Sequence, residues 1–145
     1  MNIGRVRHKK EILGRKEWVR FPMLKLGGLL ARVDTGARTS SLHAVNVKPF
    51  ERDCEHWVRF DSLGREGLEA RLWKRKDVRS SNGEVESRYF IKTKIRFNEG
   101  KSLYLKLSLT DRDAMTYPVL LGRRLLDGRF LVDSGSAFLM GEDIK

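Results

Sequence analysis

The residues with the clearest chemical potential are three consecutive ones, Asp34, Thr35 and Gly36. They directly follow a mainly apolar run, residues 29–33, which predicts a carboxyl group on a tight loop at the end of a strand. The Thr hydroxyl can form a hydrogen bond within such a loop, and Gly permits backbone angles that other residues avoid. A carboxylate that is held rigidly and partly shielded from water suits general acid–base catalysis. We therefore predict Asp34 as the catalytic carboxylate, with Thr35 and Gly36 shaping its loop.

Asp-Thr-Gly is also a common turn sequence, so the surrounding residues decide its meaning. Upstream, a strand over residues 17–26 is expected to turn at Gly27-Gly28 and to return toward the Asp. Far downstream, the apolar run 117–121 leads into Gly122-Arg123 and a short helix over residues 123–126. The motif is therefore preceded by a hairpin and followed by a second apolar strand that ends in Gly-Arg.

This order of motifs resembles the retropepsin family of aspartic peptidases, in which Asp-Thr-Gly-Ala and a later apolar-apolar-Gly-Arg helix are fixed landmarks. Residues 33–44, with 118–126 and 130–133, look more closely like a bacterial family labelled ATP-dependent zinc protease and associated with the RimK type of glutamate ligase. The resemblance covers nearly the whole chain. It implies an all-β fold, a closed acid-protease barrel with one short C-terminal helix, and it implies structural motif roles for Ala37, Gly122 and Arg123.

The implied chemistry needs two carboxylates that share one proton, because like charges about 3 Å apart cannot both ionise. The chain offers one such lobe, so we expect a homodimer in which two copies of Asp34 face each other. A second triplet, Asp133-Ser134-Gly135, leaves open a dyad of Asp34 and Asp133 within one chain. A simple turn after the apolar run 130–132 is the other interpretation of that triplet.

Substrate contacts are expected at two places. The resemblance puts the substrate-covering flap of retropepsins at the hairpin of residues 78–97, where Ser81, Asn82 and Gly83 are the predicted binding residues. The Gly-rich tip of the viral flaps is not kept there, which leaves the function of the flap open. Arg38 follows the catalytic carboxylate by four residues and could either lower its pKa or bind a substrate carboxylate in bidentate fashion.

The charge balance indicates an acidic partner. The chain has 30 Lys and Arg against 19 Asp and Glu, a net charge of +11, and with Arg38 this favours an acidic or glutamate-rich peptide or protein substrate. A dense basic patch at residues 71–79 interleaves Trp73 with cations, as a nucleic-acid surface would. A solvated strand edge is the simpler interpretation of that patch. The competing hypothesis is a noncatalytic basic β-barrel that binds an acidic peptide or RNA, with nucleic acid the less favoured partner.

Motifs for metals, nucleotides or a serine nucleophile do not occur. His-Glu-x-x-His is missing, and the zinc ligands that remain are Cys54, His56 and, if the fold brought it close, His43. No phosphate-binding Gly-x-x-x-x-Gly-Lys-Ser/Thr sequence supports ATP binding. Ser40 and Ser41 lack a Gly-x-Ser-x-Gly elbow, so His43 is expected to be a core or edge histidine. We expect no metal and no cofactor.

The elements that must position these residues have a dominant period of two. Apolar residues alternate with polar ones over residues 91–97 and 103–109, which predicts strands with one buried face, and a further strand is expected over residues 40–47. We expect one domain, residues 1–145. Charged first residues, no membrane-length apolar run and Cys54 as the only cysteine favour a cytoplasmic protein without a membrane partner.

Overall fold

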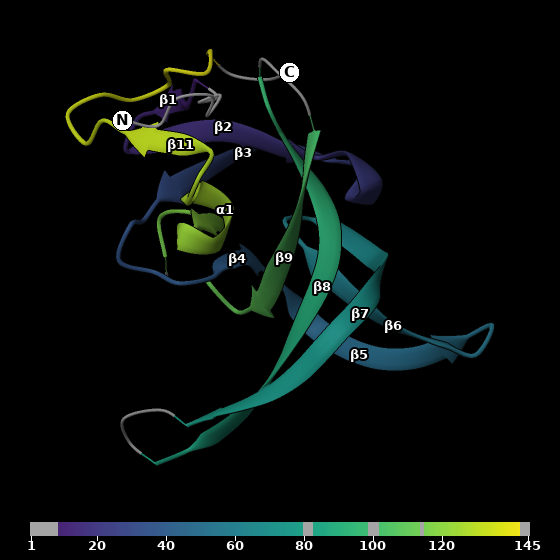
Figure 1. Ribbon diagram of the computed structural model, residues 1–145. Helices are drawn as coiled ribbons and strands as arrows, with labels where there is room; N and C mark the ends of the chain where they lie inside the picture. The colour runs from purple at the N-terminus through teal and green to yellow at the C-terminus, as the bar shows by residue number, and fades with distance from the viewer. Residues whose placement is uncertain (1–8, 80–82, 99–101, 114, 143–145) are drawn as a thin grey trace, which may run out of the picture.

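The computed structural model describes residues 9–79, 83–98, 102–113 and 115–142. Within them the chain forms strands, one 3-10 helix and one short α-helix, in an order that is almost entirely β (Figure 1). The elements are β1 (Glu11–Leu13), β2 (Lys16–Phe21), η1 (Pro22–Leu24), β3 (Leu26–Val33), β4 (Ser40–His43), β5 (Val45–Arg52), β6 (Glu55–Ser62), β7 (Arg65–Arg79), β8 (Val85–Phe97), β9 (Ser102–Thr110), β10 (Val119–Leu121), α1 (Arg123–Leu126) and β11 (Phe130–Val132).

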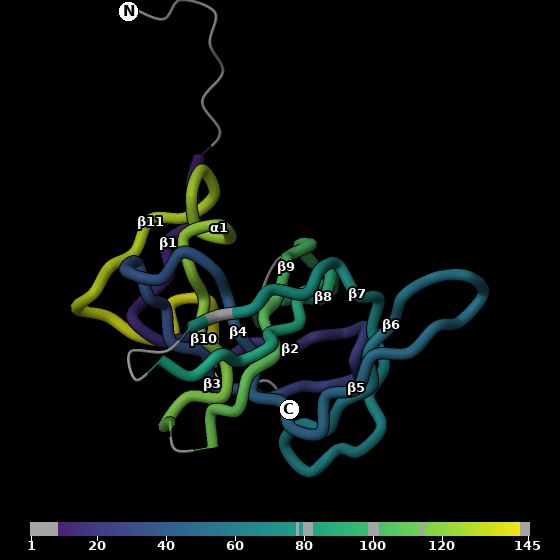
Figure 2. The backbone as a smooth tube through the Cα atoms, turned by 90° about the horizontal axis from the view of Figure 1, so that it is seen from below, coloured from purple at the N-terminus to yellow at the C-terminus, as the bar shows by residue number. Residues whose placement is uncertain are grey.

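Six strands close into a barrel. They are hydrogen-bonded in the order β2-β3-β10-β4-β9-β8, and β8 pairs back onto β2. The sheet continues from β8 through β7 and β6 to β5, and the two short strands β1 and β11 pair in parallel as a separate sheet. Figure 2 shows β1, β11 and α1 grouped on one side and β5, β6 and β7 on the other. The predicted closed barrel with one short C-terminal helix is confirmed.

The barrel interior is built from the inward faces of the long strands. Ile91 and Ile95 of β8 and Leu107 of β9 are fully buried, and Lys92, Lys94 and Lys106 alternate with them on the opposite face. Alternating side chains point to opposite faces of a sheet, so this pattern gives each strand one core face. The predicted half-buried strands over 91–97 and 103–109 are therefore confirmed, as is the helix over 123–126.

The predicted turn at Gly27-Gly28 is wrong. The chain reverses earlier, at η1 and at Lys25, whose φ of 54° is left-handed. Pro22 supplies the fixed φ with which a tight turn begins, and Lys25 donates its N–H to the Pro22 carbonyl to close it. Gly27 and Gly28 instead lie inside β3, at the point where its pairing with β2 shifts register.

A single strand over residues 40–47 is also wrong. β4 ends at His43 and lies in the barrel between β10 and β9, whereas β5 starts at Val45 and pairs with β6 outside it. Between them, buried Ala44 donates its N–H to Thr110. Apolar alternation does not show where a strand changes partners, so the sequence could not predict this break. No helix among the described residues is long and apolar enough to cross a membrane.

Candidate active site

Two parallel strands bring the distant motifs together. β10 runs beside β3 with Leu121 opposite Val33, so Asp34 and Gly122 leave the sheet side by side. The Asp34 N–H donates to the Leu121 carbonyl at 2.9 Å, which extends the ladder into the loop. The carboxyl ends of parallel strands share one edge of a sheet, which is why residues far apart in sequence build one site here.

The loop itself orients one oxygen of the Asp34 side chain. Oδ1 accepts the Gly36 N–H at 2.9 Å, and the Ala37 N–H closes the turn on the Asp34 carbonyl at 3.2 Å. The described residues donate no hydrogen bond to Oδ2. Asp34 is half-buried, while Thr35 and Gly36 are exposed. The side chain is thus fixed through one oxygen, and the other is available to a reactant or a partner.

Arg123 holds the loop from α1. Its Nη1 donates to the carbonyls of Thr35 at 3.1 Å and Gly36 at 3.2 Å, and its backbone N–H donates to the Ala37 carbonyl at 2.8 Å. A guanidinium presents several donors in a rigid fork, so it can restrain two consecutive carbonyls at once.

Gly122 is required by close packing against the same loop. A Cβ at this position would lie 2.5 Å from the Thr39 carbonyl oxygen, too close for any side chain. Its N–H donates to the Ser40 Oγ at 3.1 Å, so Ser40 has a structural partner. The structure therefore assembles six of the predicted residues in one place: Asp34, Thr35, Gly36, Ala37, Gly122 and Arg123.

The predicted substrate contacts are less closely tied to this loop. Arg38 is exposed, its carbonyl accepts the Arg124 N–H, and within the described residues its side chain makes no hydrogen bond or ion pair with Asp34. Gly83 lies in the β7–β8 hairpin with a left-handed φ of 87°. Ser81 and Asn82 fall outside the described residues. Their roles remain predictions.

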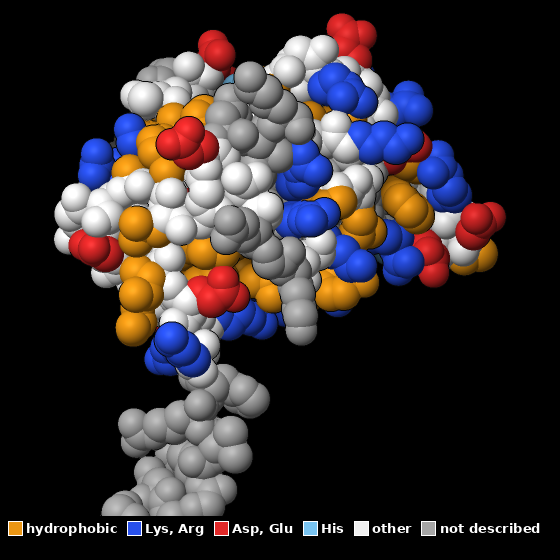
Figure 3. All heavy atoms as spheres, turned by 90° about the horizontal axis from the view of Figure 1, so that it is seen from above, with side chains coloured by type: hydrophobic (Ala, Val, Ile, Leu, Met, Phe, Trp, Pro, Cys, Tyr) orange, Lys and Arg blue, Asp and Glu red, His pale blue; other side chains and the backbone are white. Residues whose placement is uncertain are grey.

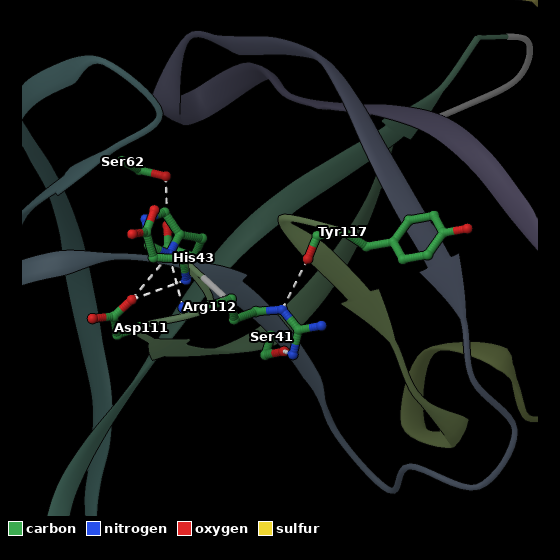
Figure 4. Close-up of polar contacts among 7 residues, drawn as sticks. Ser41, His43, Ser62, Asp111, Arg112 and Tyr117 are labelled. Atoms are coloured by element: carbon green, nitrogen blue, oxygen red, sulfur yellow. Dashed lines mark hydrogen bonds and ion pairs between the residues drawn. The ribbon is translucent and has the colours of Figure 1, made fainter. Parts of the chain in front are cut away.

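Sequence reasoning missed Arg112, which lies between β9 and β10. Its Nε donates to the Tyr117 carbonyl at 3.1 Å, its Nη1 to Ser41 Oγ at 3.3 Å, and its backbone N–H to His43 Nδ1 at 2.8 Å (Figure 4). These contacts fix the guanidinium against β4, the strand that follows the Asp34 loop. The sole local signal was an Asp-Arg-Asp stretch, residues 111–113, directly after the strand that ends at Thr110.

The charge of the Asp34 side chain also acts on Arg112. Burial lowers the pKa of Arg112, the neighbouring charge of Arg32 lowers it further, and the charge of Asp34 raises it. Asp34 and Arg112 thus influence each other electrostatically, and the described hydrogen bonds and ion pairs do not join them directly.

His43 occupies a supporting position. Its side chain is 12% exposed, its Nδ1 lies 3.7 Å from Asp111 Oδ1, and its carbonyl accepts the Ser62 hydroxyl (Figure 4). Because Nδ1 accepts the Arg112 N–H, the neutral ring carries its proton on Nε2. His43, expected as a core or edge histidine, lies largely buried on β4, between β10 and β9, where it accepts the Arg112 N–H.

The Asp133 loop repeats the hydrogen bonds of the Asp34 loop. Asp133 donates its N–H across a parallel strand pair to Leu13 at 2.8 Å, Gly135 donates to Asp133 Oδ1 at 3.0 Å, and Ser136 donates its N–H to the Asp133 carbonyl. Here, however, Oδ2 is also occupied, by the Ser136 hydroxyl at 2.9 Å. Gly14 packs on this loop as Gly122 does on the other, with its Cβ position 2.5 Å from Ser136 O.

Cys54 and His56 lie at the β5–β6 turn. Cys54 is exposed with a left-handed φ of 62°, and His56 Nδ1 is 3.8 Å from Glu51 Oε1. Within the part of the chain that the structure describes, no three His, Cys, Asp or Glu side chains are grouped to hold a metal ion.

Known proteins share this sequence and fold. A protein named "Probable alpha-L-glutamate ligase" from Shewanella halifaxensis is 41% identical over 140 residues, which are 92% of this chain and 30% of that protein. A protein of the same name from Desulfotalea psychrophila is 36% identical over 94% of this chain and 31% of its own length. The chain thus spans about a third of the curated relatives it matches.

A crystal structure of a protein of unknown function from Legionella pneumophila has a TM-score of 0.76 and 28% identity, and covers 91% of this chain and 99% of its own. The family model described as "Retropepsin-like aspartic endopeptidase RimB" matches residues 12–143. This confirms the resemblance to retropepsins that the Asp-Thr-Gly-Ala and Gly-Arg motifs indicated. The chain belongs to the RimB-like family of retropepsin-like aspartic endopeptidases.

Proposed function

We propose that this protein is an aspartic-type endopeptidase whose reactive group is Asp34 and whose substrates are acidic peptide segments. The observation that carries the proposal is the Asp34 loop, which leaves Oδ2 without a donor from the described residues while Arg123 restrains the loop carbonyls. A catalytic group held in this manner needs little reorganisation before it reacts. Family membership supports the same chemistry.

The reaction requires a second carboxyl group. In the proposed enzyme it is Asp34 of a second copy related by a twofold axis, so that the pair shares one proton. The unprotonated member takes a proton from water, and that water attacks the peptide carbonyl carbon while the protonated member donates to the carbonyl oxygen. The resulting intermediate then collapses, with a proton passing to the leaving amine. Asp133 is a weaker candidate for the second group, because both of its oxygens already accept hydrogen bonds.

The preference for acidic substrates follows from the charges around Asp34. Arg112 and Arg32 are close enough to influence each other, and two like charges near one site favour an anion between or beside them. The net charge of +11 attracts such a substrate over longer distances. The relatives named for glutamate ligation suggest the same class, since ligated glutamates form a carboxylate-rich peptide.

Hydrolysis of a fluorogenic oligoglutamate peptide tests the proposal. Asp34→Asn keeps the shape of the side chain but removes its acid–base function, and should lower kcat by about 10²–10⁴-fold. Asp133→Asn is the matched control in the similar loop and should retain hydrolysis. Unchanged hydrolysis by Asp34→Asn would overturn the catalytic assignment, and loss in both variants would point to a dyad within one chain.

Arg112→Gln separates substrate preference from catalysis. The variant should raise KM for the acidic peptide and leave KM for the matching glutamine peptide nearly unchanged, because only the former loses a charge-assisted contact. Equal effects on the two peptides would rule out Arg112 as a determinant of acidic specificity.

A further inference from the structure

A basic hollow lies between α1, β8 and β9, outside the set of residues that shape the Asp34 loop. Four cationic side chains line it, and none of its described lining residues is acidic. Lys92 comes from β8, Lys106 from β9, and the two arginines from α1 and the segment just after it. The polar residues that line this hollow are Ser40, Lys92, Tyr104, Lys106, Arg124 and Arg129.

Like charges lie close together in this basic hollow. In the β8–β9 ladder Lys92 lies directly opposite Lys106, an arrangement of like charges that destabilises a sheet. Among the described residues no ion pair joins Lys92, Lys106 or Arg124 to an acidic side chain. Arg129 is fixed by a hydrogen bond from Nη1 to the Leu125 carbonyl at 3.3 Å. A bound oxyanion would offset this repulsion.

Aromatic rings accompany the cations. Tyr104 is 68% exposed and lies opposite Lys94, whose Nζ is 4.8 Å from the ring centroid. Lys106 Nζ reaches across β8 and lies 4.0 Å from the centroid of Trp73 on β7. One side of the Tyr104 ring is thus supported by a cation while most of the residue faces solvent.

We propose that the basic hollow binds the phosphates of a single-stranded nucleic acid and that Tyr104 stacks on one of its bases. Proteins that bind single strands combine a cationic groove with aromatic side chains on which bases stack. An acidic peptide would use the four cations but would gain little from an exposed Tyr. The site is separate from the proposed peptidase reaction and does not depend on it.

Fluorescence anisotropy with a fluorescein-labelled oligouridylate tests this site. The double variant Lys92→Gln/Arg124→Gln should weaken binding and make the slope of log K against log salt shallower by about 1.4, because each lost phosphate contact on a single strand contributes about 0.7. Tyr104→Ala should weaken binding by at least about fivefold. Lys9→Gln/Lys10→Gln removes the same charge from two exposed residues elsewhere and should leave the slope unchanged.

Three results would overturn the proposal. The first is equal weakening by the two double variants, which would mean that net charge alone drives binding. The second is an unchanged affinity in Tyr104→Ala, which would exclude stacking on that ring. The third is tighter binding of a labelled oligoglutamate than of the oligouridylate, with the same loss in Lys92→Gln/Arg124→Gln, which would assign the hollow to acidic peptides.

Discussion

At the scale of single residues, the Asp34 loop depends on Arg123 for its shape. The Arg123 side chain reaches from α1 to two consecutive carbonyls, those of Thr35 and Gly36. The backbone N–H of Arg123 donates to the next carbonyl, that of Ala37. Arg123 is exposed, so these contacts add little to the core and act chiefly on the position of the loop. Its role is therefore one of positioning, since it does not contact the Asp34 carboxyl group among the described hydrogen bonds.

Arg123→Lys tests this positioning role. Lys keeps the positive charge but replaces the fork by a single flexible ammonium group, so the loop loses its restraint. We expect kcat to fall by up to about 10²-fold, the effect of a small misplacement of reacting groups, with little change in the melting temperature. Arg96→Lys, on an exposed position of β8, is the control. A wild-type kcat in Arg123→Lys would contradict the role.

Asp61 makes the stability of the fold depend on pH in the acidic range. The Asn46 side chain donates to Asp61 Oδ2 at 2.8 Å and the Gly67 N–H to Oδ1 at 2.9 Å, and these bonds lower the pKa of Asp61 below its usual value of 3.8. A group whose pKa is lower in the folded state stabilises that state above its usual pKa. This contribution is lost as the pH falls through the lowered value.

Asn46→Gly removes the first donor and still allows the left-handed φ of 54° at this position. The pKa of Asp61, followed by NMR titration, should rise toward its usual value. The stability difference from wild type should be largest near neutral pH and should shrink as the pH falls below about 4. A difference that does not change with pH would show that only the backbone effect of glycine is present.

At the scale of elements, two glycines hold two similar loops against strand ends. Gly122 after β10 and Gly14 after β1 each approach a loop carbonyl so closely that a Cβ would lie 2.5 Å from the oxygen. Beside Gly14, the buried side chain of Glu17 on β2 accepts N–H groups from Gly14, Leu139 and Met140. The C-terminal segment is thereby fastened to the barrel.

Gly122→Ala should displace the Asp34 loop. Overpacking of this kind costs about 1–3 kcal/mol in the free energy of unfolding, and kcat should fall with it because the loop bears the proposed reactive group. Gly27→Ala in β3 is the matched control, since its Cβ would meet nothing closer than 3.8 Å. Urea denaturation measures the free energy of unfolding of each variant. Equal values for Gly122→Ala and Gly27→Ala would contradict the packing argument.

At the scale of the whole molecule, the proposed reaction needs a second carboxyl group besides Asp34. Among the described residues, no donor reaches Oδ2 of Asp34, and in the proposed enzyme a second copy supplies the other carboxyl group. The surface is rich in Lys and Arg, which in Figure 3 are concentrated over one half of the face and interspersed with hydrophobic side chains. This charge repels like copies at low salt, so assembly should become stronger as salt rises.

Mixing experiments test the dimer. Wild-type protein that exchanges subunits with an excess of Asp34→Asn should lose its hydrolytic activity, because nearly every wild-type chain then pairs with a chain that cannot share the proton. The same excess of Asp133→Asn should leave activity intact. Full activity in the first mixture, together with a monomer by sedimentation, would exclude a site shared between chains.

The sequence by itself determined the strands with one buried face, the short helix at 123–126 and the six residues that meet around the Asp34 loop. These follow from local periodicity and from motifs whose spacing is fixed by the family. Tertiary structure alone decided the place of the turn at η1, the division of residues 40–47 between barrel and hairpin, and the contacts of Arg112 with Ser41, His43 and Tyr117. The physical reason is that strand partners and charge neighbours are set by contacts between distant segments, which local periodicity does not encode.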